Sequence, residues 1–111
     1  MSRALGEFEQ LVLLATLHLG EGAYGAPIVA AIEERTARSV DRTAVYVTLR
    51  RLEARGLVTS HMSEPRAERG GKPRRMVQVT PAGAQALIEA RKAIDGMWQG
   101  LDPRLSTLLG D

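Results

Sequence analysis

The sequence contains no cysteine and few aromatic residues, with one Trp, two Tyr and one Phe among 111 residues. The absence of cysteine excludes disulfides, thiolate metal sites and cysteine nucleophiles, and it favours a reducing compartment. The two histidines, His18 and His61, lie on different predicted elements with no acid at ligand spacing nearby, so we expect no metal and no cofactor. Without a base–nucleophile pairing, a phosphate-cradling loop or clustered carboxylates, the sequence also disfavours an enzyme.

Long hydrophobic runs are absent as well. The longest run, residues 11–15, is far shorter than the roughly 20 residues that cross a bilayer. Glu7 and Glu9 interrupt the N-terminal stretch where a signal peptide needs an apolar segment. These features predict a soluble, cytoplasmic protein with no membrane partner.

Positive charge is concentrated in one part of the chain. The formal net charge is only +2, but residues 42–75 carry nine Lys or Arg against three acids, a balance of +6. The remaining residues carry six bases and ten acids, so a basic face is expected to oppose an acidic remainder. Such asymmetry favours a polyanionic partner.

Helical periodicity covers the first half of the chain. Apolar residues at helical spacing predict one helix over residues 7–19, ended by Gly20, and a second that opens near Tyr24. The apolar arc of the first helix is wider than a single core-facing stripe, which predicts two packing neighbours. Asp41 is expected to cap a third helix that ends before Gly56.

A β-hairpin and a final helix are predicted in the second half. Residues 58–65 and 74–79 are typical of two strands, with Gly70-Gly71 between them among basic residues. Thr80-Pro81 supplies an N-cap and a first-turn proline for a helix over residues 81–101. The weaker signal at Asp102-Pro103 suggests one more turn.

These elements predict one small domain that is mostly α with a small β-hairpin. We expect residues 1–80 to form a winged helix-turn-helix and residues 81–111 to form a C-terminal dimerisation helix and tail. A small domain buries a low fraction of its surface, so an apolar helix left over from the core favours a dimer.

The third predicted helix carries a polar and basic side opposite its apolar stripe. At about 100° per residue, Val45, Leu49 and Leu52 share the buried side. The residues that project away, with their flanking arginines, are Arg42, Thr43, Tyr46, Val47, Arg50 and Arg51. Exposed arginines on helices are common, so this pattern alone also fits a solvated surface.

The mixture of side chains on this surface suits double-stranded DNA. A helix in the major groove needs a hydroxyl, an apolar group and an arginine, and Arg50 is the best candidate to read a base. Tyr46, Arg42 and Arg51 are expected to contact phosphates. In the hairpin, the residues expected to reach phosphates are Arg66, Arg69, Lys72, Arg74 and Arg75. Gly70 and Gly71 are expected to allow a tight tip that fits beside the duplex.

Taken in order, several short segments resemble the PadR-like family of transcriptional regulators. They are Tyr24-Gly25 with Ile28, Ala44-Val45-Tyr46 with Leu49, Arg51-Leu52-Glu53, Gly56-Leu57-Val58, Arg69-Gly70-Gly71 and Thr80-Pro81-Ala82-Gly83. The resemblance covers roughly residues 8–101. It implies a homodimeric winged-helix repressor, with Tyr46 in the recognition helix and the C-terminal helix in the dimer interface. Met76 and Val77 replace aromatic residues that often follow the wing, and the chain resembles the short members of the family.

An apolar seam in the last helix independently favours a homodimer. Leu87, Ile94 and Leu101 recur every seven residues, as in helices that pair. The expected interface consists of Leu11, Leu14, Leu87, Ile94, Met97, Trp98 and Leu101. We expect Trp98 to pack in this interface; the alternative, implied by related short regulators, is that Trp98 holds a small, flat hydrophobic effector.

Two classes of function therefore remain. The first is a sequence-specific transcriptional repressor that reads an inverted repeat as a homodimer, with release by an effector as an extension. The second is a winged helix that binds another protein or RNA. A protein-docking wing usually exposes apolar residues, whereas this hairpin carries cations, so the charge pattern favours the first class.

Overall fold

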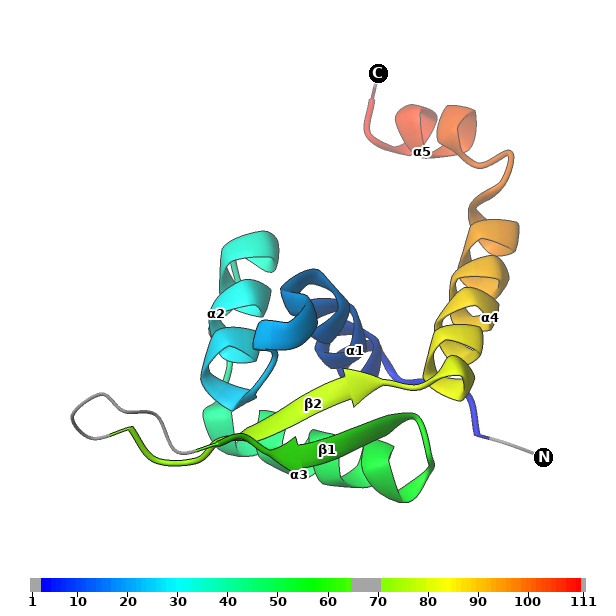
Figure 1. The fold of residues 1–111 in the computed structure, drawn as a ribbon. Helices are drawn as coiled ribbons and strands as arrows, with labels where there is room; N and C mark the ends of the chain where they lie inside the picture. Colours follow the sequence, from blue (N-terminus) through cyan, green and yellow to red (C-terminus); the bar gives the residue numbers. More distant parts are fainter. Residues whose placement is uncertain (1–2, 65–70, 111) are drawn as a thin grey trace.

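The computed structural model describes residues 3–64 and 71–110. In these residues the elements are α1 (Glu7–Leu19), η1 (Gly20–Gly22), α2 (Gly25–Thr36), α3 (Arg42–Ala54), β1 (Val58–Met62), β2 (Arg75–Val79), α4 (Pro81–Trp98) and α5 (Asp102–Leu108). The predicted fold class, mostly helical with one hairpin, is confirmed. Figure 1 shows α1, α2 and α3 gathered beside the hairpin, whereas α4 leads away from it and carries α5 at its far end.

The core lies between the first three helices and one face of the hairpin. Its largest fully buried side chains are Leu13, Ile28, Leu52, Val12 and Val45. Val58 of β1 and Val77 of β2 extend this cluster, and Leu87 of α4 completes it. Each helix contributes residues spaced three or four apart, so the helical period predicted the residues that meet here.

Capping interactions fix the orientation of α3. The Asp41 carboxylate accepts a hydrogen bond from the Thr43 amide at 3.0 Å, so the predicted N-cap is confirmed. The turn before it is held by the Glu33 carboxylate, which accepts from the Val40 amide at 2.9 Å. The C-cap of helix α2 is Ala37, whose backbone is left-handed with φ 57°. Glycine is the usual residue at such a position, so its absence here left the end of α2 without a sequence signal.

The two strands form an antiparallel pair in which Val58 lies opposite Val79 and Met62 lies opposite Arg75. The first strand ends at Met62, three residues before the predicted boundary at residue 65. Beyond Met62 the Ser63 amide still donates to the Arg74 carbonyl at 2.7 Å, but the Arg74 amide donates to the Ser63 hydroxyl at 2.8 Å instead of to a backbone carbonyl. The hairpin is also tied to the helices, because the Val77 amide donates to the Ala23 carbonyl at 2.9 Å.

The C-terminal helix is shorter than predicted. Helix α4 ends at Trp98 rather than at residue 101, because Gln99 already leaves the helical conformation with ψ 127° and Gly100 follows with φ 82°. Asp102 is the first residue of α5, and no side chain caps that helix, so the cap suggested for Asp102 is wrong. No helix in the described part of the chain is long and apolar enough to span a membrane.

The start of α4 is fastened to the beginning of β1. The Thr80 hydroxyl accepts from the Gly83 amide at 3.1 Å, as predicted for an N-cap, and donates to the Gly56 carbonyl at 2.7 Å. The Thr80 amide donates to the Leu57 carbonyl at 3.0 Å. A β-carbon on Gly83 would collide with this same Leu57 carbonyl oxygen, so only glycine permits such close packing.

We predict that Gly83→Ala lowers the free energy of unfolding by about 1–3 kcal/mol, because the added methyl group meets rigid backbone. Urea unfolding followed by circular dichroism would measure the change. Gly96→Ala in the same helix is the control: its β-carbon meets nothing within 4 Å, and it should stabilise the protein by roughly 0.5–1 kcal/mol. Equal stability of the two variants would contradict the close packing.

Candidate nucleic-acid interface

Helix α3 presents the predicted polar side to solvent. Thr43, Arg42, Arg50 and Arg51 are exposed, and Tyr46 is 46% exposed. Val45, Leu49 and Leu52 are buried on the opposite side, so the predicted rotation of the helix is confirmed. Val47 also lies on this side, but its side chain is half-buried.

Tyr46 is seated against the first turn of α2. Gly25 lies under its ring, and a β-carbon at Gly25 would come within 2.8 Å of both Cζ and Oη of Tyr46. The glycine therefore provides the space in which the ring rests, which explains why Tyr24-Gly25 and Tyr46 occur together in the sequence. The contact fixes one edge of the exposed α3 surface relative to α2.

The Glu9 carboxylate of α1 pairs with arginines that lie outside the exposed side of α3. The Glu9 carboxylate pairs with Arg55 and with Arg3, each at 3.3 Å. Arg55 belongs to the basic stretch of the sequence, but it is directed towards α1 by Glu9 and by the Arg3 carbonyl. Within residues 3–64 and 71–110, Arg42, Arg50 and Arg51 form no ion pair, so their charge is available to a partner.

A second ion pair links α1 to the segment after α2. The Arg38 guanidinium lies 2.7 Å from the Glu7 carboxylate. The hydrogen bond from Arg38, and then its charge, lower the pKa of the Glu7 carboxyl and raise the pKa of the Arg38 guanidinium. Both side chains are largely exposed, so the pair contributes little to stability.

The described hairpin cations differ in their surroundings. Lys72 is exposed. Arg75 is exposed and donates to the Ser60 hydroxyl at 3.0 Å, which in turn donates to the Glu53 carboxylate at 2.9 Å. Arg74 is half-buried, and its Nη1 donates to the Tyr24 hydroxyl at 2.6 Å. The remaining predicted hairpin residues, Arg66, Arg69 and Gly70, lie outside the described residues.

Three residues of this region were missed by sequence reasoning as functional positions: Tyr24, Glu53 and Ser60. Tyr24 accepts a hydrogen bond from Arg74, and Ser60 accepts one from Arg75. Glu53 accepts a hydrogen bond from Ser60. Tyr24 and Arg74 are 50 residues apart, so no local spacing could reveal the pair. Ser60 lies opposite Val77 in the hairpin, and only the register of the strands brings its hydroxyl near Arg75.

A hollow of about 220 Å³ separates α3 from the hairpin. Its walls include Tyr46 and Arg50 of α3 and Ser60 and Arg75 of the hairpin. The residues singled out on the two elements therefore border one shared depression. Arg50 of α3 and Arg75 of the hairpin both line this depression, together with the acidic Glu53.

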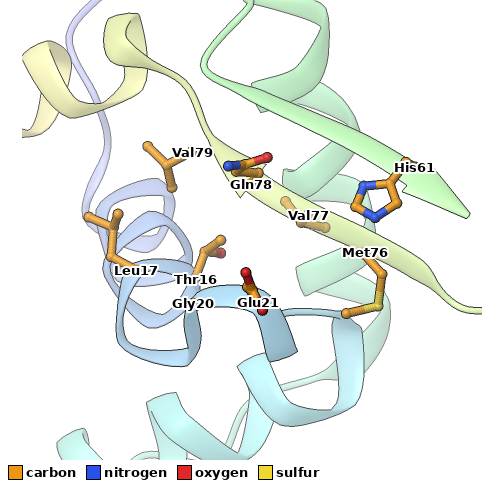
Figure 2. A pocket seen from close by; sticks show the side chains of 9 residues that line it. All are labelled: Thr16, Leu17, Gly20, Glu21, His61, Met76, Val77, Gln78 and Val79. Atoms are coloured by element: carbon orange, nitrogen blue, oxygen red, sulfur yellow. The ribbon is translucent and has the colours of Figure 1, made fainter. Parts of the chain in front are cut away.

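Another hollow, of about 570 Å³, lies between the end of α1 and the hairpin. Figure 2 shows its lining: Thr16, Leu17, Gly20, Glu21, His61, Met76, Val77, Gln78 and Val79. His61 and Glu21 are the titratable side chains in this lining. In the described part of the chain no three His, Cys, Asp or Glu residues are grouped closely enough to hold a metal ion.

The predicted dimer residues divide between the core and an exposed surface. Leu87 is 9% exposed and belongs to the chain's own core, and Leu11 is half-buried against it. Ile94 is 55% exposed and Met97 76% exposed, and Leu14, Trp98 and Leu101 are exposed as well. A groove of about 600 Å³ runs between α1 and α4, lined by apolar residues that include Leu14, Leu17, Ile88 and Ile94.

Comparison with solved structures identifies the architecture. A PadR family transcription regulator from Clostridium difficile superposes with a TM-score of 0.72 at 21% identity, over 90% of this chain and 99% of that one. A PadR family regulator from Eggerthella lenta gives 0.60 at 28% identity, over 93% of this chain and 86% of that one. A transcriptional regulator from Clostridium thermocellum gives 0.68 at 20% identity, over 86% and 89%. The sequence matches none of the curated proteins with which it was compared.

A three-helix core followed by an antiparallel hairpin, with the exposed side of α3 beside it, is the winged helix-turn-helix architecture. The model of the Transcriptional regulator PadR-like family matches residues 13–89, which span α1 to the first half of α4. The chain therefore belongs to the PadR-like family of transcriptional regulators, and the resemblance seen in the sequence is confirmed.

We predict that Gly25→Ala displaces the Tyr46 ring while changing the free energy of unfolding by less than about 1 kcal/mol, because the clash falls on a side chain that can move. Ring-proton chemical shifts of Tyr46 would report the displacement. Gly22→Ala, whose β-carbon meets nothing within 4 Å, is the control and should leave these shifts unchanged. Unaltered Tyr46 signals in Gly25→Ala would show that the ring is not held there.

Proposed function

We propose that the protein is a sequence-specific DNA-binding repressor that reads an inverted repeat as a homodimer. The observation that carries this proposal is the set of exposed cations on α3 and the hairpin, two of which, Arg50 and Arg75, line one shared depression. Arg42, Arg50 and Arg51 have no ion-pair partner among the described residues. A surface of this kind neutralises phosphates, and its binding weakens steeply as salt is added. Salt-independent binding, or preference for RNA or a protein, would favour the second class of function.

Within this surface we assign base reading to Arg50. Its side chain is exposed on α3, borders the hollow shared with the hairpin, and carries donors that match the O6 and N7 acceptors of guanine. Arg42, Arg51, Lys72 and the Tyr46 hydroxyl are assigned to phosphates, which fix the protein on the duplex without reading its sequence. Thr43 and Val47 lie on the same side and complete the mixture of contacts.

We predict that Arg50→Ala relaxes preference at one base position in each half-site, at a cost of roughly 1–3 kcal/mol in discrimination. Selection of bound duplexes from a random pool, repeated with the variant, would measure the change position by position. Lys92→Ala removes the same charge from the exposed surface of α4, outside the groove between α1 and α4, and should leave the selected sequence intact. If both variants select the wild-type sequence, Arg50 does not read a base.

The homodimer is proposed from the shape of the chain and its exposed apolar residues. The radius of gyration is 17.0 Å, against about 13 Å for a compact domain of roughly 100 residues. The excess arises because α4 and α5 project from the core and expose Ile94, Met97, Trp98 and Leu101. We propose that a second copy covers these residues and Leu14. To read two half-sites one duplex turn apart, the dimer would need to hold its two α3 helices about 34 Å apart.

In this proposal residues 81–111 form the dimerisation segment, and residues 1–80 form the DNA-binding domain. Leu87 and Leu11 would support the interface from the core, since both belong to or pack against it. Trp98 is assigned to packing between the protomers. An effector that inserts beside Trp98 remains the alternative, and its chemistry would be flat and hydrophobic.

We predict that Ile94→Asp yields a monomer in sedimentation velocity, because an unpaired carboxylate cannot be buried between two apolar helices. Ile94 is 55% exposed within the single chain, so the variant should keep its helical circular dichroism spectrum. Lys92→Asp introduces the same side chain two residues away, outside the α1–α4 groove, and should remain dimeric. A dimeric Ile94→Asp protein would contradict the assigned interface.

A further inference from the structure

The guanidinium of Arg74, a half-buried residue, is held against Tyr24. Its Nη1 donates to the Tyr24 hydroxyl at 2.6 Å, and its Cζ lies 4.5 Å from the centre of the Tyr24 ring. Arg74 is therefore both hydrogen-bonded to and stacked on the same aromatic residue. Stacking of this kind is favourable for arginine, because its planar cation is weakly hydrated.

The backbone of Arg74 also closes the base of the hairpin. Its amide donates to the Ser63 hydroxyl at 2.8 Å, and its carbonyl accepts from the Ser63 amide at 2.7 Å. Ser63 and Arg74 follow β1 and precede β2, so this pair is the last described link before the tip. We call Ser63 and Arg74 the hairpin base.

Tyr24 stands at the junction of the two DNA-facing elements. It is the N-cap residue of α2, and the next residue, Gly25, seats the Tyr46 ring of α3. The residue before it, Ala23, accepts the Val77 amide of β2 at 2.9 Å. Three consecutive residues thus hold the hairpin on one side and the recognition helix on the other.

We propose that Arg74 is a positioning residue, which through Tyr24 sets the orientation of the hairpin relative to α3. A phosphate contact by Arg74, as the sequence suggests, would draw its guanidinium away from the phenol. Exposed Lys72, by contrast, is free to extend towards the duplex. The expected effect on DNA binding rests on the proposed function, whereas the contact between Arg74 and Tyr24 is a property of the protein without DNA.

The anchoring is tested without DNA by amide hydrogen exchange. In Tyr24→Leu, we expect the amides of Ser63 and Arg74 to exchange at least about threefold faster, since the hairpin base has lost its link to α2. The Gly83 amide, which donates to Thr80 far from Tyr24, serves as the control and should be unchanged. Unchanged exchange at Ser63 and Arg74 would overturn the anchoring.

The consequence is tested by DNA binding of Tyr24→Leu, Arg74→Gln and the double variant at several salt concentrations. If Arg74 positions the hairpin, each single variant should weaken DNA binding by roughly threefold to tenfold. The double variant should bind no more weakly than either single variant, because both changes break the same contact. Tyr24→Leu should leave the salt dependence of binding unchanged. Footprinting should show lost protection where the hairpin lies and retained protection at the α3 half-site. Lys72→Gln, as a phosphate contact, should instead lower the salt slope by about one.

The opposite result separates the two accounts of Arg74. Wild-type binding by Tyr24→Leu, with a reduced salt slope in Arg74→Gln, would show that Arg74 contacts phosphate and would overturn the inference. If the wild-type protein binds no duplex, the proposed function fails, whereas the exchange experiment still decides the anchoring. Tyr24→Phe keeps the stacked ring and loses only the hydroxyl, so it should give a smaller effect and serves if Tyr24→Leu does not fold.

Discussion

The burial of one side of α3 is the constraint on which the rest of the surface depends. Val45 and Leu52 are fully buried against α1 and α2, and Leu49 lies with them. This apolar contact fixes the rotation of the helix about its axis, so the opposite side must face solvent. The position of the exposed side chains of α3 therefore follows from a buried side made of Val45, Leu49 and Leu52 with Thr48 among them, and the chemistry of the outer surface can vary without altering this packing.

Much of the fold could be predicted from the sequence because its signals are local. The bounds of α1, the Asp41 cap of α3 and the Thr80 cap of α4 follow from periodicity and from hydrogen bonds that span two or three residues. The end of β1 could not be predicted, because it depends on a bond between Ser63 and Arg74 across the hairpin. The end of α4 was also misplaced: the apolar spacing continues to Leu101, but Gln99 and Gly100 leave the helical conformation.

The sequence was enough to predict which side chains of α3 are exposed, but not which cations form contacts within the chain. Helical geometry alone places Tyr46 and Arg50 on the outer side of α3. Which cations are engaged within the chain depends on contacts between distant segments, such as Arg55 with Glu9 and Arg74 with Tyr24, which are 46 and 50 residues apart. Charge counted along the sequence treats all arginines alike. Among the described residues, the structure separates arginines that form ion pairs, such as Arg55, from Arg74, which is hydrogen-bonded to and stacked on Tyr24.

The extended α4 carries a consequence for the behaviour of the protein on dilution. Beyond Ala90 this helix leaves the core, and Ile94, Met97 and Trp98 are more than half exposed in the single chain. In the proposed homodimer this segment would gain order from association, so its stability would follow mass action and vary with the amount of protein present. Occupancy of a target by paired subunits would then rise more steeply than in proportion to abundance, and a cell could tune the response through synthesis and turnover alone.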